Sequence, residues 1–222
     1  MKIIARIHSP FPEKFGIPRQ SGLALTCANI VFEPEYRNPD ALRGIEGFSH
    51  LWLIWKFSEA VREDWSPTVR PPKLGGNTRM GVFATRSPFR PNPIGLSSVK
   101  LIDVDYSCEN APVIRVSGAD IMDGTPIYDI KPYLPYTDSH PEATGGFSLK
   151  GGEGLLSVDI PTELLGKIPE ELRQGLFGVL ENDPRPGYSE DGGRVYTLSY
   201  GENEVAFTVA NNVLTVRDIY KR

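Results

Sequence analysis

Gly81-Val-Phe-Ala-Thr-Arg-Ser-Pro-Phe-Arg-Pro-Asn-Pro-Ile-Gly-Leu-Ser-Ser-Val-Lys-Leu101 is the stretch from which the fold and the binding site of this 222-residue chain are predicted. Its two ends read as strands, whereas its middle, residues 86–93, holds two arginines, three prolines and one asparagine. Proline fixes φ and removes a backbone donor, so this middle cannot lie at the centre of a sheet. The stretch therefore predicts a stiff loop that aims Arg86 and Arg90 into a binding site at a small ordering cost.

Basic charge gathers around this loop. The net charge of the chain is −4, yet residues 62–100 hold seven basic and two acidic side chains. Clustered basic charge is typical of places where phosphates or carboxylates bind. A merely solvated surface is the alternative interpretation, but the interleaved prolines and glycines favour a shaped site.

The overall composition is that of a globular protein, with 40% hydrophobic and 23% charged residues. The first dozen residues do not resemble a signal peptide, and no apolar run approaches the length of a membrane span. Cys27 and Cys108 have no paired spacing, so we expect reduced thiols rather than a disulfide or a metal site. The expectation is a cytoplasmic enzyme or binding protein with no metal and no membrane partner.

Most of the chain reads as short strands. Strands are expected over residues 1–8, 48–57, 97–104, 113–118 and 127–130, with one bent strand or two short ones over 22–33. Pro132 is expected to end the pairing of the strand over residues 127–130. After a glycine-rich linker, a smaller α+β unit is expected, with a helix from about Pro169 to Asn182 and strands over 155–160, 194–200, 204–210 and 213–218.

Several common kinds of site are disfavoured. No dinucleotide or P-loop glycine motif occurs, no Gly-x-Ser-x-Gly elbow occurs, and His8, His50 and His140 lack metal spacing. Polar groups gather instead in loops 18–20, 86–93, 123–133 and 183–188. Asp123 either caps a turn or faces a cationic or donor-rich ligand. A sulfonium methyl donor suits this mixed polarity, because methyl transfer depends mainly on aligning donor and acceptor.

Several motifs in order resemble the TrmO-type (TsaA-like) tRNA methyltransferase family of bacteria and archaea. They are Pro18-Arg-Gln20, Phe48-Ser-His-Leu-Trp52, Arg70-Pro-Pro-Lys-Leu-Gly-Gly-Asn77, Gly81-Val-Phe-Ala-Thr-Arg-Ser87, Arg90-Pro-Asn-Pro-Ile-Gly95, Asp123-Gly-Thr-Pro126, Asp129-Ile-Lys-Pro-Tyr133 and, in the family's C-terminal extension, Asp183-Pro-Arg-Pro186. The resemblance implies an S-adenosylmethionine-dependent enzyme that methylates N6 of N6-threonylcarbamoyladenosine beside the anticodon, at position 37 of tRNA. It also implies a single-sheeted β-barrel over residues 1–140 that pairs into a homodimer, a linker over 141–154, and a small α+β domain over 155–222.

The resemblance assigns site residues as well. The donor site would comprise Pro18, Arg19, Gln20, Ser58, Glu59, Arg86, Leu96, Asp123, Gly124, Thr125 and Pro126, although the family often has histidine at the position of Ser58. The tRNA substrate would contact Arg90, Asn92, Lys131 and Arg185, the last at the substrate entrance. The acceptor nitrogen is a poor nucleophile, so Asp129 or Tyr133 is expected to take its proton. The alternative function is non-catalytic binding of RNA or small anions through the same loop, residues 86–93, which we call the arginine loop.

Overall fold

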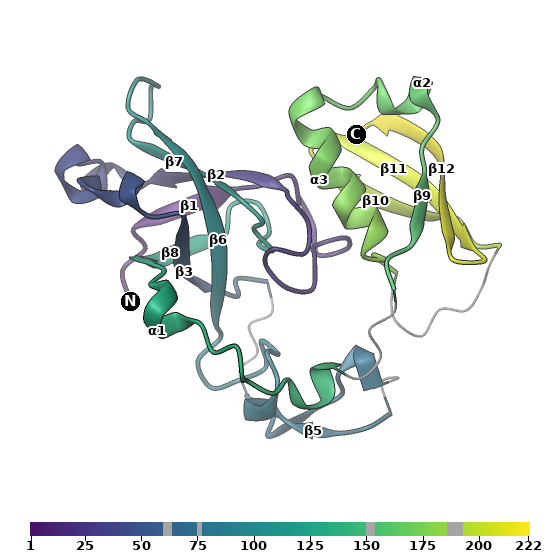
Figure 1. The fold of residues 1–222 in the computed structure, drawn as a ribbon, viewed down its shortest axis with the longest axis horizontal. Coiled ribbons are helices and arrows are strands. Elements are labelled where there is room, and N and C mark those ends of the chain that lie inside the picture. The colour runs from purple at the N-terminus through teal and green to yellow at the C-terminus, as the bar shows by residue number, and fades with distance from the viewer. Residues whose placement is uncertain (60–63, 75–76, 150–153, 186–192) are drawn as a thin grey trace.

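The computed structural model describes residues 1–59, 64–74, 77–149, 154–185 and 193–222. Its strands form two large sheets, and its helices are few and short (Figure 1). The prediction of a mainly β chain is therefore confirmed. Residues 75–76 and 186–188, which belong to predicted motifs or loops, lie outside the described residues.

The larger sheet contains six antiparallel strands. They are β1 (Ala5–His8), β2 (Cys27–Phe32), β3 (His50–Lys56), β6 (Ile94–Asp105), β7 (Val113–Ser117) and β8 (Pro126–Pro132). Their order is β1-β2-β7-β6-β3-β8, and β8 also pairs with β1, so the sheet closes into a barrel. Strand β8 ends at Pro132, as expected, but the strand runs past Ile130 and Pro132 itself still pairs with Leu51, because proline is tolerated at a strand end. Tyr133 N–H then donates to His50 O.

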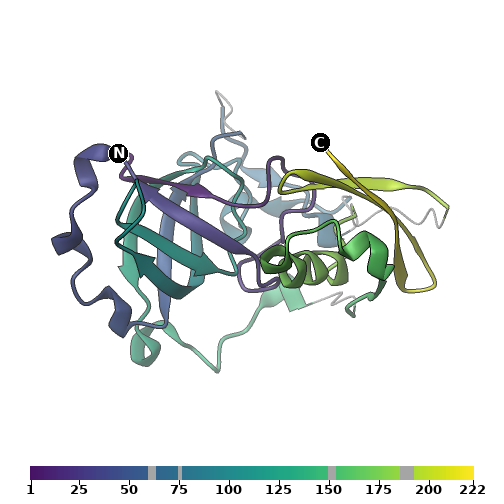
Figure 2. The ribbon, with the colours of Figure 1, turned by 90° about the horizontal axis from the view of Figure 1, so that it is seen from above.

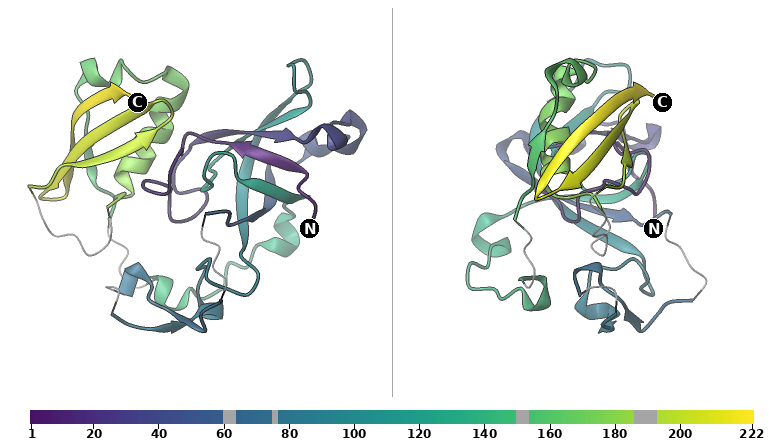
Figure 3. Two further views of the ribbon diagram at one scale, coloured as in Figure 1. Left: turned by 180° about the vertical axis from the view of Figure 1, so that it is seen from behind. Right: turned by 90° about the vertical axis from the view of Figure 1, so that its right-hand side faces the viewer.

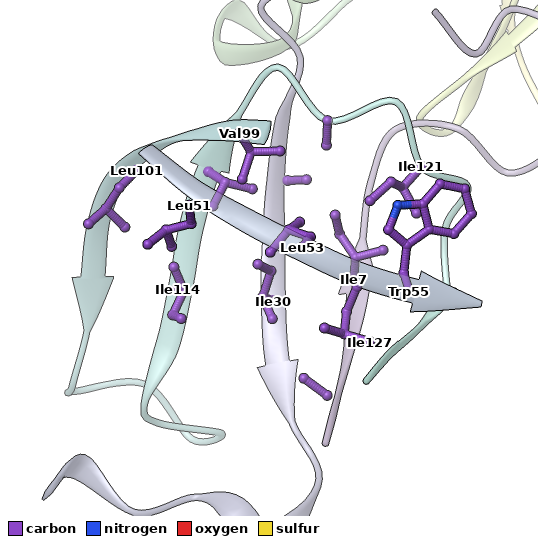
Figure 4. Close-up of a cluster of buried hydrophobic side chains, with 14 of the residues drawn as sticks. Ile7, Ile30, Leu51, Leu53, Trp55, Val99, Leu101, Ile114, Ile121 and Ile127 are labelled. Atoms are coloured by element: carbon purple, nitrogen blue, oxygen red, sulfur yellow. The ribbon is translucent and has the colours of Figure 1, made fainter. Parts of the chain in front are cut away.

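Side chains alternate between the inside and the outside of this barrel. Leu51, Leu53 and Trp55 of β3 are buried, whereas the intervening Trp52 and Ile54 are half-buried on the outer face. The inner residues pack against Ile7, Ile30, Ile114 and Ile127 from the other strands (Figure 4). The apolar run over 48–57 is thus one strand whose two faces have different roles, as expected from a period of two.

Shorter elements connect these strands. Three single-turn 3-10 helices, η1 (Pro34–Tyr36), η2 (Pro39–Leu42) and η3 (Ile45–Gly47), lead from β2 to β3. Between β3 and β6, β4 (Thr68–Val69) pairs with β5 (Met80–Gly81); η4 (Pro72–Leu74) lies between these two strands and η5 (Val82–Ala84) follows them. This segment extends away from the barrel (Figures 1 and 3). After β8 come α1 (Pro135–Asp138) and η6 (Gly146–Leu149).

The second large sheet belongs to the C-terminal part. Its order is β10-β11-β12-β9, with β9 parallel to β12 and the other neighbours antiparallel. The strands are β9 (Ser157–Asp159), β10 (Tyr196–Tyr200), β11 (Asn203–Ala210) and β12 (Val213–Lys221); the helices are α2 (Thr162–Leu165) and α3 (Glu170–Glu181). Leu176, Val179 and Leu180 of α3 are buried in the core of this part, as the sequence predicted for the helix.

The loop between β1 and β2 joins the two parts. Phe11 and Ala24 of this loop belong to the hydrophobic core of the C-terminal part, although they lie within the first 140 residues. Helix α3 lies against the loop (Figure 2), because Gly175 and Gly178 permit a close approach: a Cβ on Gly178 would lie 3.1 Å from Ala24 Cα. The C-terminal part therefore supports the loop that carries residues 18–20. None of the helices in the described residues is long and apolar enough to cross a membrane.

Candidate functional site

A cavity of about 530 Å³ lies where the β1–β2 loop, the end of β3, the arginine loop and the start of β6 meet. Nine predicted site residues line it: Pro18, Arg19, Gln20, Ser58, Glu59, Arg86, Arg90, Leu96 and Thr125. Cavities of roughly 300–1,000 Å³ are typical of small-molecule sites. The structure thus brings together residues that are far apart in the sequence, from Pro18 to Thr125.

A hydrogen bond joins the first two predicted loops. Arg86 Nη1 donates to Gln20 Oε1, and Gln20 Nε2 donates to the carbonyl oxygen of Arg19. Arg86 remains exposed, so its guanidinium keeps donors for a bound anion. The pair Gln20 and Arg86 therefore forms one wall of the cavity from two distant parts of the chain.

Arg90 has a different role in the same loop. Its Nη2 donates to the carbonyl oxygens of Val82, at 3.0 Å, and Thr85, at 2.8 Å. Its Nε is buried and has no hydrogen-bond partner among the described residues. Arg90 thus lines the cavity while its guanidinium also fixes the turn before it, which accounts for part of the predicted stiffness.

Aromatic rings form another wall of the cavity. Trp55 and Phe57 are in ring contact, with centroids 4.3 Å apart, and both line the cavity. Gly95 lies under Trp55, because a Cβ there would be only 2.1 Å from Trp55 Cε2. The glycine of the motif at residues 90–95 is therefore required by the position of the tryptophan ring.

Asp120 is a cavity residue that sequence reasoning missed. Trp55 Nε1–H donates to Ser97 Oγ at 3.0 Å, and Ser97 O–H donates to Asp120 Oδ1 at 2.5 Å. Burial raises the pKa of the Asp120 carboxyl, although the hydrogen bond from Ser97 and the charge of Arg86 oppose that shift. The sequence signal was a carboxylate within the otherwise apolar run Ala119–Met122.

The charges around the cavity are of both signs. Arg19 and Arg86 face it together with Lys14 and Lys56, while Glu59 and Asp120 supply carboxylates. Lys14 Nζ donates to the carbonyl oxygen of Glu59 at 2.7 Å, which ties the β1–β2 loop to the end of β3. This lining matches a ligand that carries both a carboxylate and a cationic group.

The predicted residues at 123–126 are only partly in the cavity. Asp123 Oδ1 accepts the backbone N–H of Ser9 at 3.1 Å and lies 3.4 Å from His8 Nδ1. Gly124, at φ 73°, donates its N–H to Ile7 O. Of the four residues Asp123 to Pro126, only Thr125 lines the cavity. The geometry therefore favours a structural role for Asp123, whose carboxylate binds the β1–β2 loop rather than capping its own turn.

The outer face of the barrel continues from the cavity toward the predicted substrate residues. Ile54 pairs with cavity-lining Leu96 on one side and with Asp129 on the other, so the three lie in one row across β6, β3 and β8. Two strand spacings place the backbone of Asp129 about 10 Å from that of Leu96. Lys131 lies two positions further along β8, opposite Trp52, and its Nζ is 2.8 Å from Asp129 Oδ2.

Three further predicted residues lie outside the lining. The ring of Tyr133 contacts Trp52, with centroids 5.5 Å apart, beyond the Asp129 row. Asn92 is exposed in the arginine loop. The guanidinium of Arg185 binds the Asp183 carboxylate at 2.8 and 2.7 Å, while its carbonyl oxygen accepts a bond from Arg19 Nη2 at 3.4 Å. Arg185 therefore connects the C-terminal part to the 18–20 loop.

The described residues contain no candidate metal site. No group of three or more histidine, cysteine, aspartate or glutamate side chains there could hold a metal ion. Both cysteines are free: Cys27 is exposed and Cys108 is half-buried.

Comparisons with known proteins find matches over most of the chain. The family model of the tRNA-methyltransferase O N-terminal domain matches residues 6–139, and that of the TrmO C-terminal domain matches residues 160–222. A tRNA (adenine(37)-N6)-methyltransferase of Escherichia coli K12 is 40% identical over 217 residues, which cover 94% of this chain and 92% of that protein.

Two further similarities concern the methyl donor and the fold. A Pseudomonas aeruginosa protein, named as an S-adenosylmethionine-dependent methyltransferase, is 39% identical over 211 residues, covering 91% of this chain and 89% of that protein. A crystal structure of TrmO from Pseudomonas aeruginosa superposes with a TM-score of 0.79 at 30% identity, covering 99% of this chain and 96% of that one.

Proposed function

Since the chain belongs to the tRNA-methyltransferase O family, we propose that it transfers a methyl group from S-adenosylmethionine to N6 of the adenine at position 37 of tRNA, with N6-threonylcarbamoyladenosine as the acceptor. The observation that carries this proposal is the cavity lined by nine of the predicted residues. Its size and its mixed polarity suit a zwitterionic donor of moderate size.

The residues present fit the donor chemically. S-adenosylmethionine supplies a methyl group made electrophilic by its sulfonium. Arg86 and Arg19 would hold the donor's carboxylate, because a guanidinium matches a carboxylate with two parallel hydrogen bonds. Asp120 would face its cationic part, and Trp55 with Phe57 would provide apolar walls for its flat base.

The acceptor side is proposed along the row that runs from Leu96 to Asp129. With this donor bound, the lone pair of the acceptor N6 would form the new bond to the methyl carbon, and the electrons of the broken carbon–sulfur bond would stay on sulfur. The N6 proton then leaves to a base, for which Asp129 and Tyr133 are the candidates. Asp129 is favoured by its place in the row of Leu96, and Lys131 beside it suits the carboxylate of the threonylcarbamoyl group.

A homodimer is part of the proposal. Beyond the acceptor row, the outer face of β6 presents Ile102, which is 47% exposed. Apolar side chains of this kind on one sheet face suit burial against a second copy. Light scattering should give twice the 24.6 kDa mass of the chain.

The experiment uses tRNA with and without N6-threonylcarbamoyladenosine, a labelled methyl donor, and mass spectrometry of the digested nucleosides. We expect one methyl group on the modified nucleoside and none on plain adenosine. Arg86→Ala should abolish transfer without unfolding the protein, whereas Arg43→Ala, an exposed arginine paired with Asp40, should keep normal turnover.

Three outcomes would contradict parts of the proposal. Methylation of unmodified adenosine would rule out the acceptor, and normal turnover of Arg86→Ala would remove that residue from the donor site. Absence of binding to S-adenosylmethionine at millimolar concentration, together with retained tRNA binding, would favour the alternative of a non-catalytic RNA-binding protein.

A further inference from the structure

Two aromatic rings are exposed together on the segment that extends from the barrel. Trp65 is 48% exposed and Phe83 is 74% exposed. Their rings stack on each other, with centroids 6.0 Å apart and planes 26° from parallel. We call Trp65 and Phe83 the ring pair. Large apolar side chains exposed next to each other mark an interaction surface more strongly than single ones do.

Hydrogen bonds fix the backbone beneath the ring pair to the donor cavity. Ser66 N–H, one residue after Trp65, donates to Phe89 O at 3.2 Å, and Phe89 lines the cavity. Val82 N–H, one residue before Phe83, donates to Pro67 O at 3.0 Å. Because Arg90 Nη2 also donates to Val82 O, the ring pair and the cavity wall belong to one connected loop assembly.

Basic side chains outnumber acidic ones on the segment that carries the ring pair. Arg70, Arg79 and Arg86 are exposed on the same segment. Arg79 Nη1 donates to Thr68 Oγ1 at 3.1 Å, which holds that arginine on the β4–β5 strand pair. Residues 62–100 carry seven basic and two acidic side chains in a chain whose net charge is −4. An anionic partner is therefore favoured here over a second copy, whose identical basic segment would repel this one.

We propose that the ring pair stacks on an unpaired base of the tRNA anticodon loop while Arg70 and Arg79 contact the neighbouring phosphates. Proteins recognise RNA mainly at single-stranded loops, where bases can be splayed out onto aromatic side chains. Interleaved rings and arginines are the pattern of such a platform. The inference rests on the proposed function, because it takes the acceptor base in the adjoining site to belong to tRNA.

The test measures binding of an anticodon stem–loop RNA and methyl transfer by the full chain. Loss of base stacking costs about 1 to 3 kcal/mol, so the double variant Trp65→Ala/Phe83→Ala should lose roughly 5- to 150-fold in RNA affinity. Its affinity for S-adenosylmethionine should stay unchanged. The conservative variant Trp65→Phe/Phe83→Tyr should restore binding, and Tyr136→Ala, which removes a ring that is 85% exposed elsewhere, serves as the matched control.

The arginines have a separate readout. Arg70→Ala and Arg79→Ala should each lower the slope of log affinity against log salt by about one, as expected for the loss of one phosphate contact. Phe83→Leu keeps an apolar side chain at an exposed position, so it tests stacking even if the double variant is unstable. It too should weaken RNA binding.

Failure of this inference differs from failure of the proposed function. If the wild-type protein methylates tRNA but the ring-pair variants bind RNA as tightly as the wild type, the stacking role is wrong and the function stands. If the variants dissociate into monomers, the ring pair is an interface between copies and the inference is overturned. If the wild type neither binds nor methylates tRNA, the proposed function itself falls.

Discussion

Asp120 is a half-buried carboxylate whose partial removal from water disfavours its charged form. Burial raises its pKa above the ordinary value of 3.8, so the folded protein holds the proton more tightly than the unfolded chain does. Its contribution to stability therefore falls as the pH rises through its folded-state pKa, and it stays low at neutral pH. A carboxylate kept under such conditions beside a cavity is typical of a functional site.

Asp120→Asn should stabilise the protein and weaken donor binding at the same time. The amide oxygen can still accept the Ser97 hydrogen bond, while the cost of a buried charge is removed. The melting temperature at pH 7 should rise by about 2 to 4 °C, which corresponds to roughly 1 kcal/mol for a chain of this size. The affinity for S-adenosylmethionine should fall by about tenfold, because a close charge partner is lost. Calorimetry and thermal melts measure both.

The pH dependence provides the control. The difference in stability between Asp120→Asn and the wild type should shrink as the pH falls toward 3.8 and below, because the wild-type carboxyl then becomes protonated and uncharged. Asp103 is the opposite case: the hydrogen bond from Arg115 lowers its pKa, so its contribution is present at neutral pH and is lost as the pH falls. An Asp120→Asn variant that melts lower than the wild type at pH 7 would show that the carboxylate is structural.

At the scale of elements, helix α3 is placed by its glycines. A Cβ on Gly175 would lie 2.4 Å from Tyr200 Oη and 3.0 Å from Thr26 Cα. At the end of the same helix, Asn182 Nδ2 donates to Leu23 O at 2.9 Å. The helix is thus fitted closely to the β1–β2 loop, and glycine is required although it is a poor helix former.

Gly175→Ala should destabilise the protein by about 1 to 3 kcal/mol, because the collision outweighs the gain of up to about 1 kcal/mol in helix propensity. Gln174→Ala places alanine at the exposed neighbouring position and should have little effect. Thermal melts compare the two variants. Equal melting temperatures for Gly175→Ala and the wild type would mean that α3 can shift away from the loop without cost.

Local sequence patterns predicted many of the elements for identifiable physical reasons, whereas most of the candidate site residues were assigned by the family resemblance. The apolar residues of β3, β6 and α3 follow the periods of strand and helix. The three prolines of residues 86–93 exclude a helix interior or a central strand, so this segment had to be a loop. Pattern alone does not tell which core a residue joins, so Phe11 was not assigned to the C-terminal core. Asp120 was missed for the same reason: its importance depends on burial against Ser97 and Trp55, which are distant in the sequence.

At the scale of the whole molecule, the C-terminal part acts on the donor site through the β1–β2 loop. Phe11 is fully buried in the C-terminal core, where its ring meets that of Tyr200 edge to face at 5.8 Å. The same loop then runs to Arg19, whose guanidinium donates to Arg185 O, and to Gln20 in the cavity wall. The loop is therefore anchored on both sides of its cavity residues by the C-terminal part.

Deletion of residues 155–222 should leave a folded barrel that binds S-adenosylmethionine weakly. The barrel keeps its own core, which includes Ile7 and Leu53, but Phe11 and Ala24 lose their cover and the 18–20 loop loses its anchors. Phe11→Ala in the full chain is the milder form of the same change. It should lower the free energy of unfolding by about 3 to 5 kcal/mol and weaken binding of the donor, although Phe11 does not line the cavity. Circular dichroism and donor titration measure both variants. A folded remnant with wild-type donor affinity and tRNA activity would show that the barrel holds its donor loop unaided.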